Sequence, residues 1–375
     1  MMTTAKQTAA LEPTHDQRRH ARDLVMQYGW NAMSYQILNP GIEWWFSEDG
    51  HAVVGYAATS GYWVVAGAPI CAPEHLSGAA QAFEAAARRC HKRVCYFGAQ
   101  GRLADMLTIR GSEARLVIGA QPVWEPSHWD AIMKGKSSLR AQISRARNKD
   151  VRVVAWPAAR ANDNPELRRC LDEWLKTRGL PPMHFLVEPD TLNHLEDRLV
   201  FVAEREGQVI GFLVASPVPQ RHGWLIEQII RGNDAPNGTV ELLLDAAMQA
   251  MTEQGAEYVT LGLSPLSRHG GTSSRQSPWM HLLLVWTRAH GRRFYNFDGL
   301  DTFKAKFQPE TWEPIYVISN ERLTSIRTMY AIAEAFSGRS PVLFVGAAIV
   351  RAAWQEMQWL WRKVQAARKE RSAQT

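Results

Sequence analysis

Short apolar runs in the second half of the chain predict four strands and one helix. Residues 199–204 and 209–215 flank a polar turn, as the two strands of a β-hairpin do. Residues 224–230 form a third apolar run. Apolar positions then recur at helical spacing over residues 239–254, and residues 258–263 return to a strand pattern. The predicted order is hairpin, strand, helix, strand.

The first half of the chain repeats this order. Residues 44–46 and 52–58 predict a hairpin, and residues 62–66 predict a third strand. Residues 73–89 have a helical pattern, and residues 94–98 are strand-like. This is the core order of an N-acetyltransferase-like (GNAT) lobe. We therefore expect an α/β (α+β) protein with tandem GNAT-like acyltransferase lobes and mixed central sheets.

A segment rich in alanine, asparagine, aspartate and proline, residues 157–165, separates the two halves and indicates a boundary. We expect a first lobe over residues 20–156 and a second lobe, with the functional site, over residues 165–320. Residues 321–375 are expected to form a helical, basic tail. A chain of 375 residues that is 46% apolar can bury a core of this size.

Positive charge is concentrated in two segments. Residues 134–152 carry seven basic residues and one acidic residue, and residues 351–375 carry six and two. The rest of the chain holds 30 basic and 34 acidic residues, so the net charge of +6 comes from these two patches. The four cysteines form no CxxC pair and match no histidine pattern, so we expect neither a metal site nor a disulfide framework.

The first basic segment has the pattern of a helix that docks by one side. Leu139, Ile143 and Ala146 recur on one face, while Arg140 and Arg147 lie on another. These cations could bind phosphates of tRNA or of lipid head groups, or they could form an ordinary solvated face.

The second basic segment predicts a C-terminal amphipathic helix. Its apolar stripe is too short to span a membrane, which needs about 20 apolar residues. The helix could lie among lipid head groups or pack on the body of the protein. No apolar run of signal-peptide type occurs near the start, so a cytoplasmic location is expected. The stripe residues are Val350, Trp354, Met357, Trp361 and Val364.

Three stretches together resemble a known family. They are residues 224–231 (WLIEQIIR), residues 261–267 (LGLSPLS) and residues 293–307 (RFYNFDGLDTFKAKF). They are similar to the soluble C-terminal domain of bacterial phosphatidylglycerol lysyltransferases, which move an amino acid from aminoacyl-tRNA to a membrane lipid. The resemblance covers approximately residues 25–318 and implies a stand-alone form without the family's membrane flippase module.

The resemblance implies a transfer site in the second lobe. Arg231 matches an arginine of the family's site, but Gln228 stands where the family has an aspartate, and Glu227 could replace it only if the strand turned its side chain inward. Glu227, Asp298 and Tyr295 are the candidates for proton transfer or for binding the α-ammonium group. With Arg231 they make up the candidate catalytic set. We expect Arg231, Asp298 and Lys304 to meet in one cleft.

Further polar residues are candidates for substrate binding, although each also has an ordinary structural explanation as a solvated or turn residue. Serines could donate hydrogen bonds, and the cations could contact phosphate or an oxyanion. The candidate substrate-binding residues are Gln228, Ser264, Ser267, Lys304, Lys306, Arg140 and Arg147.

The leading hypothesis is an aminoacyltransferase that uses aminoacyl-tRNA and an anionic phospholipid such as phosphatidylglycerol, at the inner face of the cell membrane. It requires no cofactor. The first alternative is an N-acyltransferase that takes its acyl group from coenzyme A or acyl carrier protein. Its coenzyme would need a Gly-rich turn such as the one ending at Gly238, but the spacing there is atypical. The second alternative is a non-catalytic membrane- or RNA-binding module.

Overall fold

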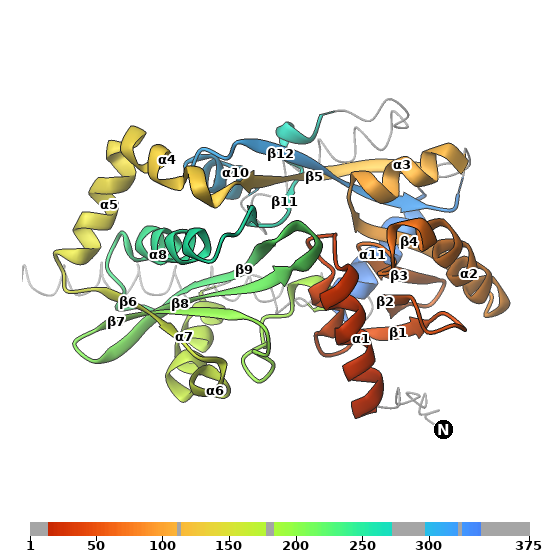
Figure 1. Ribbon diagram of the computed structural model, residues 1–375, viewed down its shortest axis with the longest axis horizontal. Helices are drawn as coiled ribbons and strands as arrows, with labels where there is room; N and C mark the ends of the chain where they lie inside the picture. The colour runs from red at the N-terminus through yellow and green to blue at the C-terminus, as the bar shows by residue number, and fades with distance from the viewer. Residues whose placement is uncertain (1–13, 111–113, 178–183, 272–296, 322–324, 339–375) are drawn as a thin grey trace, which may run out of the picture.

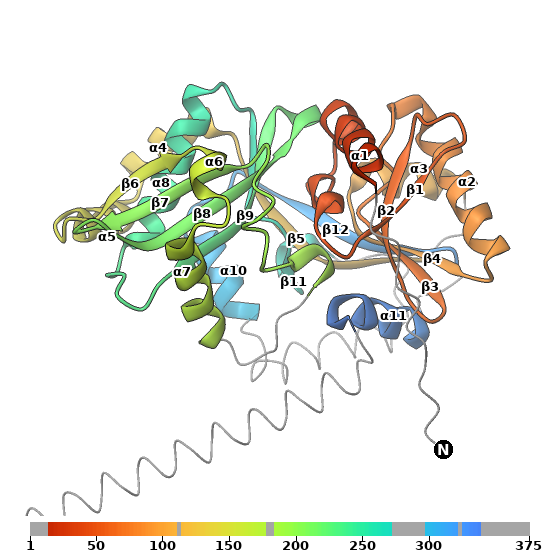
Figure 2. The same ribbon diagram turned by 90° about the horizontal axis from the view of Figure 1, so that it is seen from below.

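The computed structural model describes residues 14–110, 114–177, 184–271, 297–321 and 325–338 (Figure 1). One mixed sheet of twelve strands runs through both lobes in the order β1-β2-β3-β4-β12-β5-β10-β9-β8-β7-β6, with β11 paired beside β5. Helices cover both faces of this sheet (Figures 1 and 2).

The first lobe contains the predicted hairpin, strand, helix and strand. Strands β3 and β4 are parallel and are joined through α2, as the pattern predicted. Its strands are β1 (Glu43–Phe46), β2 (Val53–Ala58), β3 (Tyr62–Ala66), β4 (Arg93–Ala99) and β5 (Ala114–Trp124). Its helices are α1 (His15–Tyr28), η1 (Tyr35–Leu38), η2 (Pro73–His75), α2 (Leu76–Arg89) and α3 (Gly101–Arg110).

The second lobe repeats the order, with β9 and β10 parallel and joined through α8. Its strands are β6 (Arg152–Trp156), β7 (Leu199–Arg205), β8 (Gln208–Val218), β9 (Gly223–Arg231), β10 (Tyr258–Thr260) and β11 (Ser264–Pro265). Its helices are η3 (Pro126–His128), α4 (Trp129–Gly135), α5 (Ser137–Arg147), α6 (Ala158–Ala161), α7 (Pro165–Lys176), η4 (Phe185–Val187), η5 (Pro219–Arg221), α8 (Thr239–Glu253), η6 (Arg268–Gly270) and α10 (Phe297–Ala305). The predicted tandem GNAT-like architecture is confirmed.

One strand crosses between the lobes. Strand β12 (Thr311–Ser319) follows the second lobe in sequence but pairs antiparallel with both β4 and β5 of the first lobe. Helix α11 (Ile326–Ser337) then packs against β3, beneath the first lobe in Figure 2. Strand β12 lies within the predicted second lobe, residues 165–320, yet it completes the sheet of the first lobe. The predicted domain bounds, 20–156, 165–320 and 321–375, stay a prediction.

Separate hydrophobic clusters fill the two faces of each lobe. In the first lobe, α2 and α3 pack on one face, while α1, η1 and α11 pack on the other. In the second lobe, α8 and α5 cover one face of β7–β9, and α6 and α7 cover the opposite face (Figure 1). The predicted docking face of α5 is confirmed, because Leu139, Ile143 and Ala146 are buried.

Within the described residues, no helix is long and apolar enough to cross a membrane. The predicted C-terminal amphipathic helix, with the stripe that begins at Val350, lies outside these residues.

Candidate active site

Strand β9 contains a β-bulge at Glu227. In its pairing with β8, Gln228 lies opposite Val214 and Ile226 lies opposite Ala215, so Glu227 is the additional residue. Ile226 and Ile229 both pack into the cluster on the α8 side, which leaves Glu227 and Gln228 together on the other face. A bulge redirects side chains in this way. The bulge thus places the side chains of Glu227 and Gln228 on the same face, and the role of Glu227 in transfer stays a prediction.

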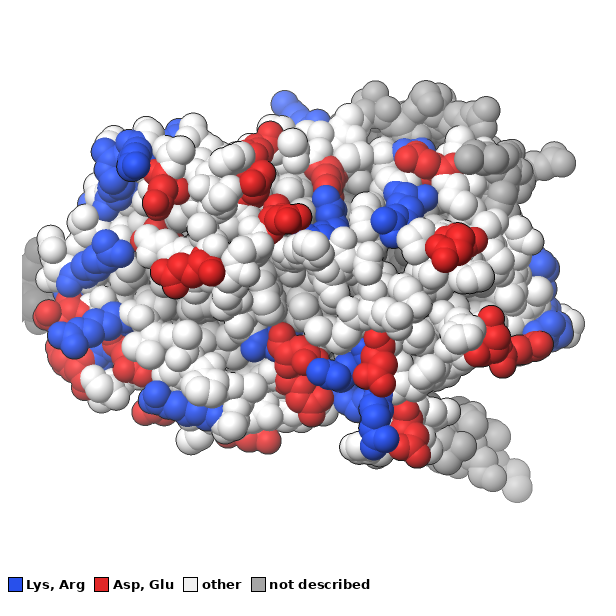
Figure 3. All heavy atoms as spheres, in the orientation of Figure 1, with Lys and Arg blue, Asp and Glu red and all other residues white. Residues whose placement is uncertain are grey.

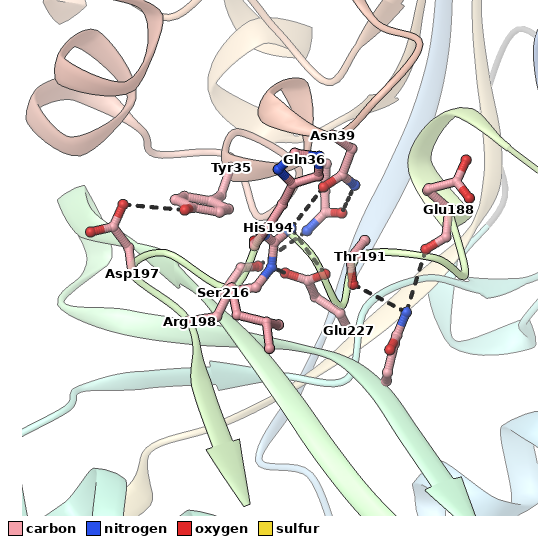
Figure 4. Close-up of polar contacts among 12 residues, drawn as sticks. Tyr35, Gln36, Asn39, Glu188, Thr191, His194, Asp197, Arg198, Ser216 and Glu227 are labelled. Carbon is pink, nitrogen blue, oxygen red and sulfur yellow. Dashed lines mark hydrogen bonds and ion pairs between the residues drawn. The ribbon is translucent and has the colours of Figure 1, made fainter. Parts of the chain in front are cut away.

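Glu227 is bound to an arginine that the sequence did not single out. Arg198, just before β7, donates from Nε to Oε1 of Glu227 at 3.0 Å, and only 1% and 7% of the two side chains are exposed. Arg198 also donates to Asn39 Oδ1 at 2.7 Å, and its guanidinium lies 4.8 Å from the Tyr35 ring (Figure 4). Arg198 thus links Glu227 to Asn39 of the first lobe, and the pair of opposite charges is buried at the junction of the lobes.

Gln228 lies beside this ion pair and binds the segment between η4 and β7. Its amide Nε2 donates to the carbonyl oxygen of Pro189 at 3.0 Å and reaches Thr191 Oγ1 at 3.5 Å. Its Oε1 is buried without a partner among the described residues. The neutral amide of Gln228 therefore holds this loop against β9.

Arg231 occupies the exposed end of β9. In the parallel pair of β9 and β10, Leu225 lies beside Thr260. Arg231 follows Leu225 by six residues on β9, so the two residues are roughly 20 Å apart at the usual rise of a strand. In the described part of the chain, no hydrogen bond or ion pair links Arg231 with Lys304. Tyr295 and the side chain of Asp298 lie outside the described residues, so the cleft expected from Arg231, Asp298 and Lys304 stays a prediction.

Lys304, on α10, is a buried lysine. Its Nζ donates to the carbonyl oxygens of Gly262 and Leu263 at 2.8 and 3.0 Å, and 4% of the residue is exposed. Burial lowers the pKa of Lys304 to about 7, against the opposing effect of Asp301. A neutral amine has two N–H donors and one lone pair, so the two carbonyls satisfy its donors and leave its lone pair for a proton.

Three polar side chains belong to the same region as this amine, and together with it we call them the Lys304 site: Asp301, whose charge acts on Lys304, Ser264, which follows Leu263 in sequence, and His269, which lies near Asp301. Ser264 Oγ and Asp301 Oδ1 are buried without a partner in the described ranges. His269 Nε2 lies 4.0 Å from Asp301 Oδ2, and its ring stacks on Trp312 with centroids 4.3 Å apart. Buried polar groups without a partner are uncommon in folded proteins, and a catalytic role is one explanation for them.

Close backbone contact positions Ser264. Strand β11 pairs with β5, where Ser264 lies opposite Ala120. A Cβ atom on the neighbouring Gly119 would lie 2.1 Å from the carbonyl oxygen of Ser264, and Gly119 has a φ of 154°. Only glycine allows this approach.

Ser267 and Lys306 have structural contacts. Ser267 Oγ accepts a hydrogen bond from His269 N at 3.2 Å and so fixes the start of η6. Lys306 pairs with Glu241 of α8, and its Nζ lies 5.1 Å from the centre of the Phe307 ring. Lys306 therefore holds the end of α10 against α8. Although it is two residues from Lys304, it lies in a different environment.

Arg140 and Arg147 are partly used to hold α5 in place. Arg140 Nη1 donates to the carbonyl oxygens of Met133 and Lys134, at 2.6 and 2.5 Å, at the end of α4. Arg147 Nη2 donates to Asp245 Oδ2 at 3.3 Å. Basic side chains nevertheless gather over α4 and α5 at the left edge of Figure 3. The exposed basic residues there are Lys134, Arg140, Arg145, Arg147 and Lys149.

A second, partly buried network joins the lobes at β12, and the sequence pattern did not indicate it because its members are far apart in sequence. Glu313 accepts two hydrogen bonds from Arg221, at 2.5 and 2.9 Å, and one each from Gln100 and Gln121, both at 2.9 Å. Burial favours the neutral acid, but these hydrogen bonds keep the pKa of Glu313 below its ordinary value.

In the described ranges, one group of side chains has the spacing of a metal site. Glu125, His128 and Glu310 each place a ligand atom within 4.8 Å of the others, and all three residues are exposed. Glu310 also accepts a hydrogen bond from the backbone of Glu125. These contacts explain the cluster without an ion.

The family model described as "Phosphatidylglycerol lysyltransferase, C-terminal" matches residues 22–319 of this chain. The chain belongs to this family. The resemblance found in the sequence is thereby confirmed. Phosphatidylglycerol lysyltransferase of Bacillus subtilis (strain 168) is 24% identical over 332 residues, which cover 87% of this chain and 38% of that protein. The chain thus spans well under half the length of this relative.

Two solved structures have the same fold as this family member. The C-terminal domain of a putative lysylphosphatidylglycerol synthetase from Agrobacterium fabrum has a TM-score of 0.72 and 23% identity, covering 86% of this chain and 97% of that one. L-PGS from Bacillus licheniformis has a TM-score of 0.69 and 20% identity, covering 89% and 96%. Both support the mixed α/β architecture of two lobes.

Proposed function

We propose that this chain transfers an aminoacyl group from aminoacyl-tRNA to a membrane lipid such as phosphatidylglycerol. Family membership and the name of the relative from Bacillus subtilis support the reaction class. The observation that carries the proposal is the buried Lys304, whose pKa of about 7 lets it exchange a proton near neutral pH, next to Ser264 and Asp301.

In the proposed reaction, a lipid hydroxyl attacks the carbonyl carbon of the aminoacyl ester. Neutral Lys304 accepts the hydroxyl proton as the new C–O bond forms. The ester bond to the terminal ribose then breaks, and the Lys304 ammonium returns the proton to the leaving ribose oxygen. Asp301 would bind the α-ammonium group, and Ser264 would donate a hydrogen bond to the substrates. The step needs no covalent intermediate and no cofactor.

The exposed cations over α4 and α5 suit the tRNA. Lys134, Arg145 and Lys149 have few internal partners among the described residues, and phosphate backbones are bound by such clusters. Contact with the cytoplasmic face of a membrane is part of the proposal, because the lipid acceptor lies there. Peripheral attachment through the C-terminal helix belongs to the same proposal.

Coenzyme A is less well supported as the acyl donor. An acyl-CoA enzyme of this fold would place a pyrophosphate at the start of α8. There, Gly238 has a φ of 98°, and a Cβ atom on it would lie 2.0 Å from the carbonyl oxygen of Gln142. A carbonyl oxygen at this position repels an anion, so we favour the aminoacyl-tRNA donor.

The test is to incubate the purified chain with radiolabelled aminoacyl-tRNAs and phosphatidylglycerol vesicles, and to extract the lipid. We expect an aminoacylated lipid, and Lys304→Met should lower the rate by at least about 100-fold because it removes the proton-transfer group. Lys176→Met, an exposed lysine at the end of α7, is the matched control and should retain the rate.

The pH dependence separates proton transfer from a structural role. The rate of the wild type should fall as the pH drops below about 7, where Lys304 is protonated. The residual rate of Lys304→Met should lack this step. No aminoacyl lipid with any amino acid would reject the proposed reaction. Consumption of an acyl thioester in place of aminoacyl-tRNA would favour the N-acyltransferase alternative.

A further inference from the structure

An exposed aromatic stack lies beside the Lys304 site. The His269 ring lies on the indole of Trp312, with ring centres 4.3 Å apart and planes 11° from parallel. Trp312 belongs to β12 and is partly buried, whereas 46% of the His269 side chain is exposed. The indole therefore covers one face of the imidazole and leaves much of the ring open to solvent. We call this pair the His269–Trp312 stack.

Backbone contacts fix the position of the stack. Ser267 Oγ accepts a hydrogen bond from His269 N at 3.2 Å, which caps the start of η6. Helix η6 packs against β5 and β12, and a Cβ atom on Gly270 would lie 2.6 Å from the carbonyl oxygen of Gly119. Gly270 thus allows η6 to lie closely on the sheet. The imidazole consequently rests on a strand rather than on a free loop.

The imidazole is held by ring contact rather than by hydrogen bonds. Within the described ranges, the ring nitrogens of His269 make no hydrogen bond, and their ion-pair contact is with Asp301, whose Oδ2 lies 4.0 Å from Nε2. That distance is longer than a hydrogen bond. An aromatic ring that is stacked on one face and exposed elsewhere suits the stacking of a further flat ring.

The stack borders the centre where the proposed ester reacts. Asp301 and Lys304 both lie on α10, and the charge of Asp301 acts on Lys304. His269 lies near the same carboxylate. In an aminoacyl-tRNA the amino acid is esterified to the ribose of the terminal nucleoside, so one sugar separates the terminal base from the reacting carbonyl. The position of the stack suits this base.

The residue before His269 supplies a positive charge. Arg268 also belongs to η6 and is exposed. A phosphodiester joins the terminal nucleoside to the rest of the tRNA, and arginine binds such phosphates. Proteins that bind single-stranded nucleic acid combine aromatic rings for the bases with cations for the backbone. His269 and Arg268 provide one of each.

We propose that the His269–Trp312 stack binds the terminal base of the aminoacyl-tRNA, which stacks on the exposed part of the imidazole. This inference rests on the proposed function and adds to it the residue that holds the donor end. Stacking uses the flat face of a base rather than its edges, so the site tolerates different bases. Phosphatidylglycerol has neither a flat ring nor a cation to place on an aromatic face. His269 is thus a binding residue for the donor and takes no part in proton transfer.

Binding of a tRNA acceptor-stem hairpin to the full chain tests the site without lipid and without aminoacylation. One hairpin ends in CCA, a second lacks only the terminal base, and fluorescence anisotropy measures both affinities. We expect the wild type to bind the complete hairpin at least about fivefold more tightly, because a stacked base contributes that much. His269→Ala should lower the affinity for the complete hairpin to that of the abasic hairpin, and should leave the abasic affinity unchanged.

Further variants separate stacking from other effects of the substitution. His269→Phe keeps a flat ring without the imidazole nitrogens, so it should keep the preference for the complete hairpin. His75→Ala, which removes an exposed histidine of η2 in the first lobe, is the matched control and should bind as the wild type does. A hairpin ending in CCG should bind like the one ending in CCA. In the transfer assay, His269→Ala should raise KM for aminoacyl-tRNA and keep kcat, because the base contact is the same in the ground state and the transition state.

Several results would overturn this inference. They are equal binding of the two hairpins by the wild type, binding of neither hairpin, and a loss in His269→Phe as large as that in His269→Ala. Coenzyme A also carries an adenine, so His269-dependent binding of coenzyme A without a preference between the hairpins would overturn it as well. A base-dependent hairpin affinity would stand even if no aminoacyl lipid formed, and formation of aminoacyl lipid would stand even if the hairpin affinities were equal.

Discussion

Replacing Lys304 with methionine should change how the stability of the folded protein depends on pH. The ammonium of Lys304 is buried among carbonyl oxygens, and burial lowers its pKa from an ordinary value of 10.5 to about 7. The unfolded chain therefore binds more protons between pH 7 and pH 10.5 than the folded chain does. Stability rises with pH wherever the unfolded state binds more protons, so this group makes the free energy of unfolding increase across that window.

The size of the effect follows from the two pKa values. Lys304 should raise the free energy of unfolding of the wild type by about 2 kcal/mol between pH 7 and pH 9. Between pH 6 and pH 7 the change should be less than about 0.5 kcal/mol, because the lysine is then largely protonated in both states. Methionine has a similar length and no titrating group, so Lys304→Met lacks this contribution.

Urea denaturation at pH 6, 7, 8 and 9, followed by tryptophan fluorescence, measures the difference between the wild type and Lys304→Met. Other titrating groups are common to both proteins and cancel in the difference. Lys176→Met should follow the wild type at every pH. A difference between wild type and Lys304→Met that stays constant within about 0.5 kcal/mol from pH 7 to pH 9 would refute the reasoning.

Two further predictions concern the contacts that hold the site. Arg198→Met should lower the free energy of unfolding by about 3–5 kcal/mol, because Glu227 is then buried without a counter-ion. The double variant Arg198→Met/Glu227→Met should recover most of that loss in urea denaturation, and equal losses in both would argue against a buried ion pair. Gly119→Ala should destabilise the protein by at least about 1 kcal/mol, because the new Cβ meets the Ser264 carbonyl oxygen. Gly61→Ala, with no heavy atom within 4 Å of its new Cβ, should be nearly neutral in the same assay and serves as the control.

Much of the fold could be predicted because the spacing of apolar residues within a short segment distinguishes a strand from a helix. The two parallel pairs, β3 with β4 and β9 with β10, each follow a hairpin and enclose one helix, as the apolar pattern indicated. The pairing of β12 could not be predicted in this way. Its residues have an ordinary strand pattern, and nothing local indicates that its partners are strands more than 180 residues earlier.

The candidate site was predicted less completely, for physical reasons that particular residues show. The bulge at Glu227 depends on pairing with β8 and leaves no mark in the apolar pattern. Lys304 and Lys306 look alike in sequence, but α10 buries the first and places the second beside Glu241. Arg198 lies about 30 residues before its partner, so only the folded chain shows the pair.

The placement of β12 separates the order of synthesis from the order of assembly. A ribosome releases β4 and β5 long before residues 311–319, which must later occupy the gap between them. Until then the amino-terminal lobe has two unpaired strand edges, and such edges invite association with other chains. Cutting the gene near residues 157–165 would therefore yield an amino-terminal fragment in which β4 and β5 lack the strand that pairs between them.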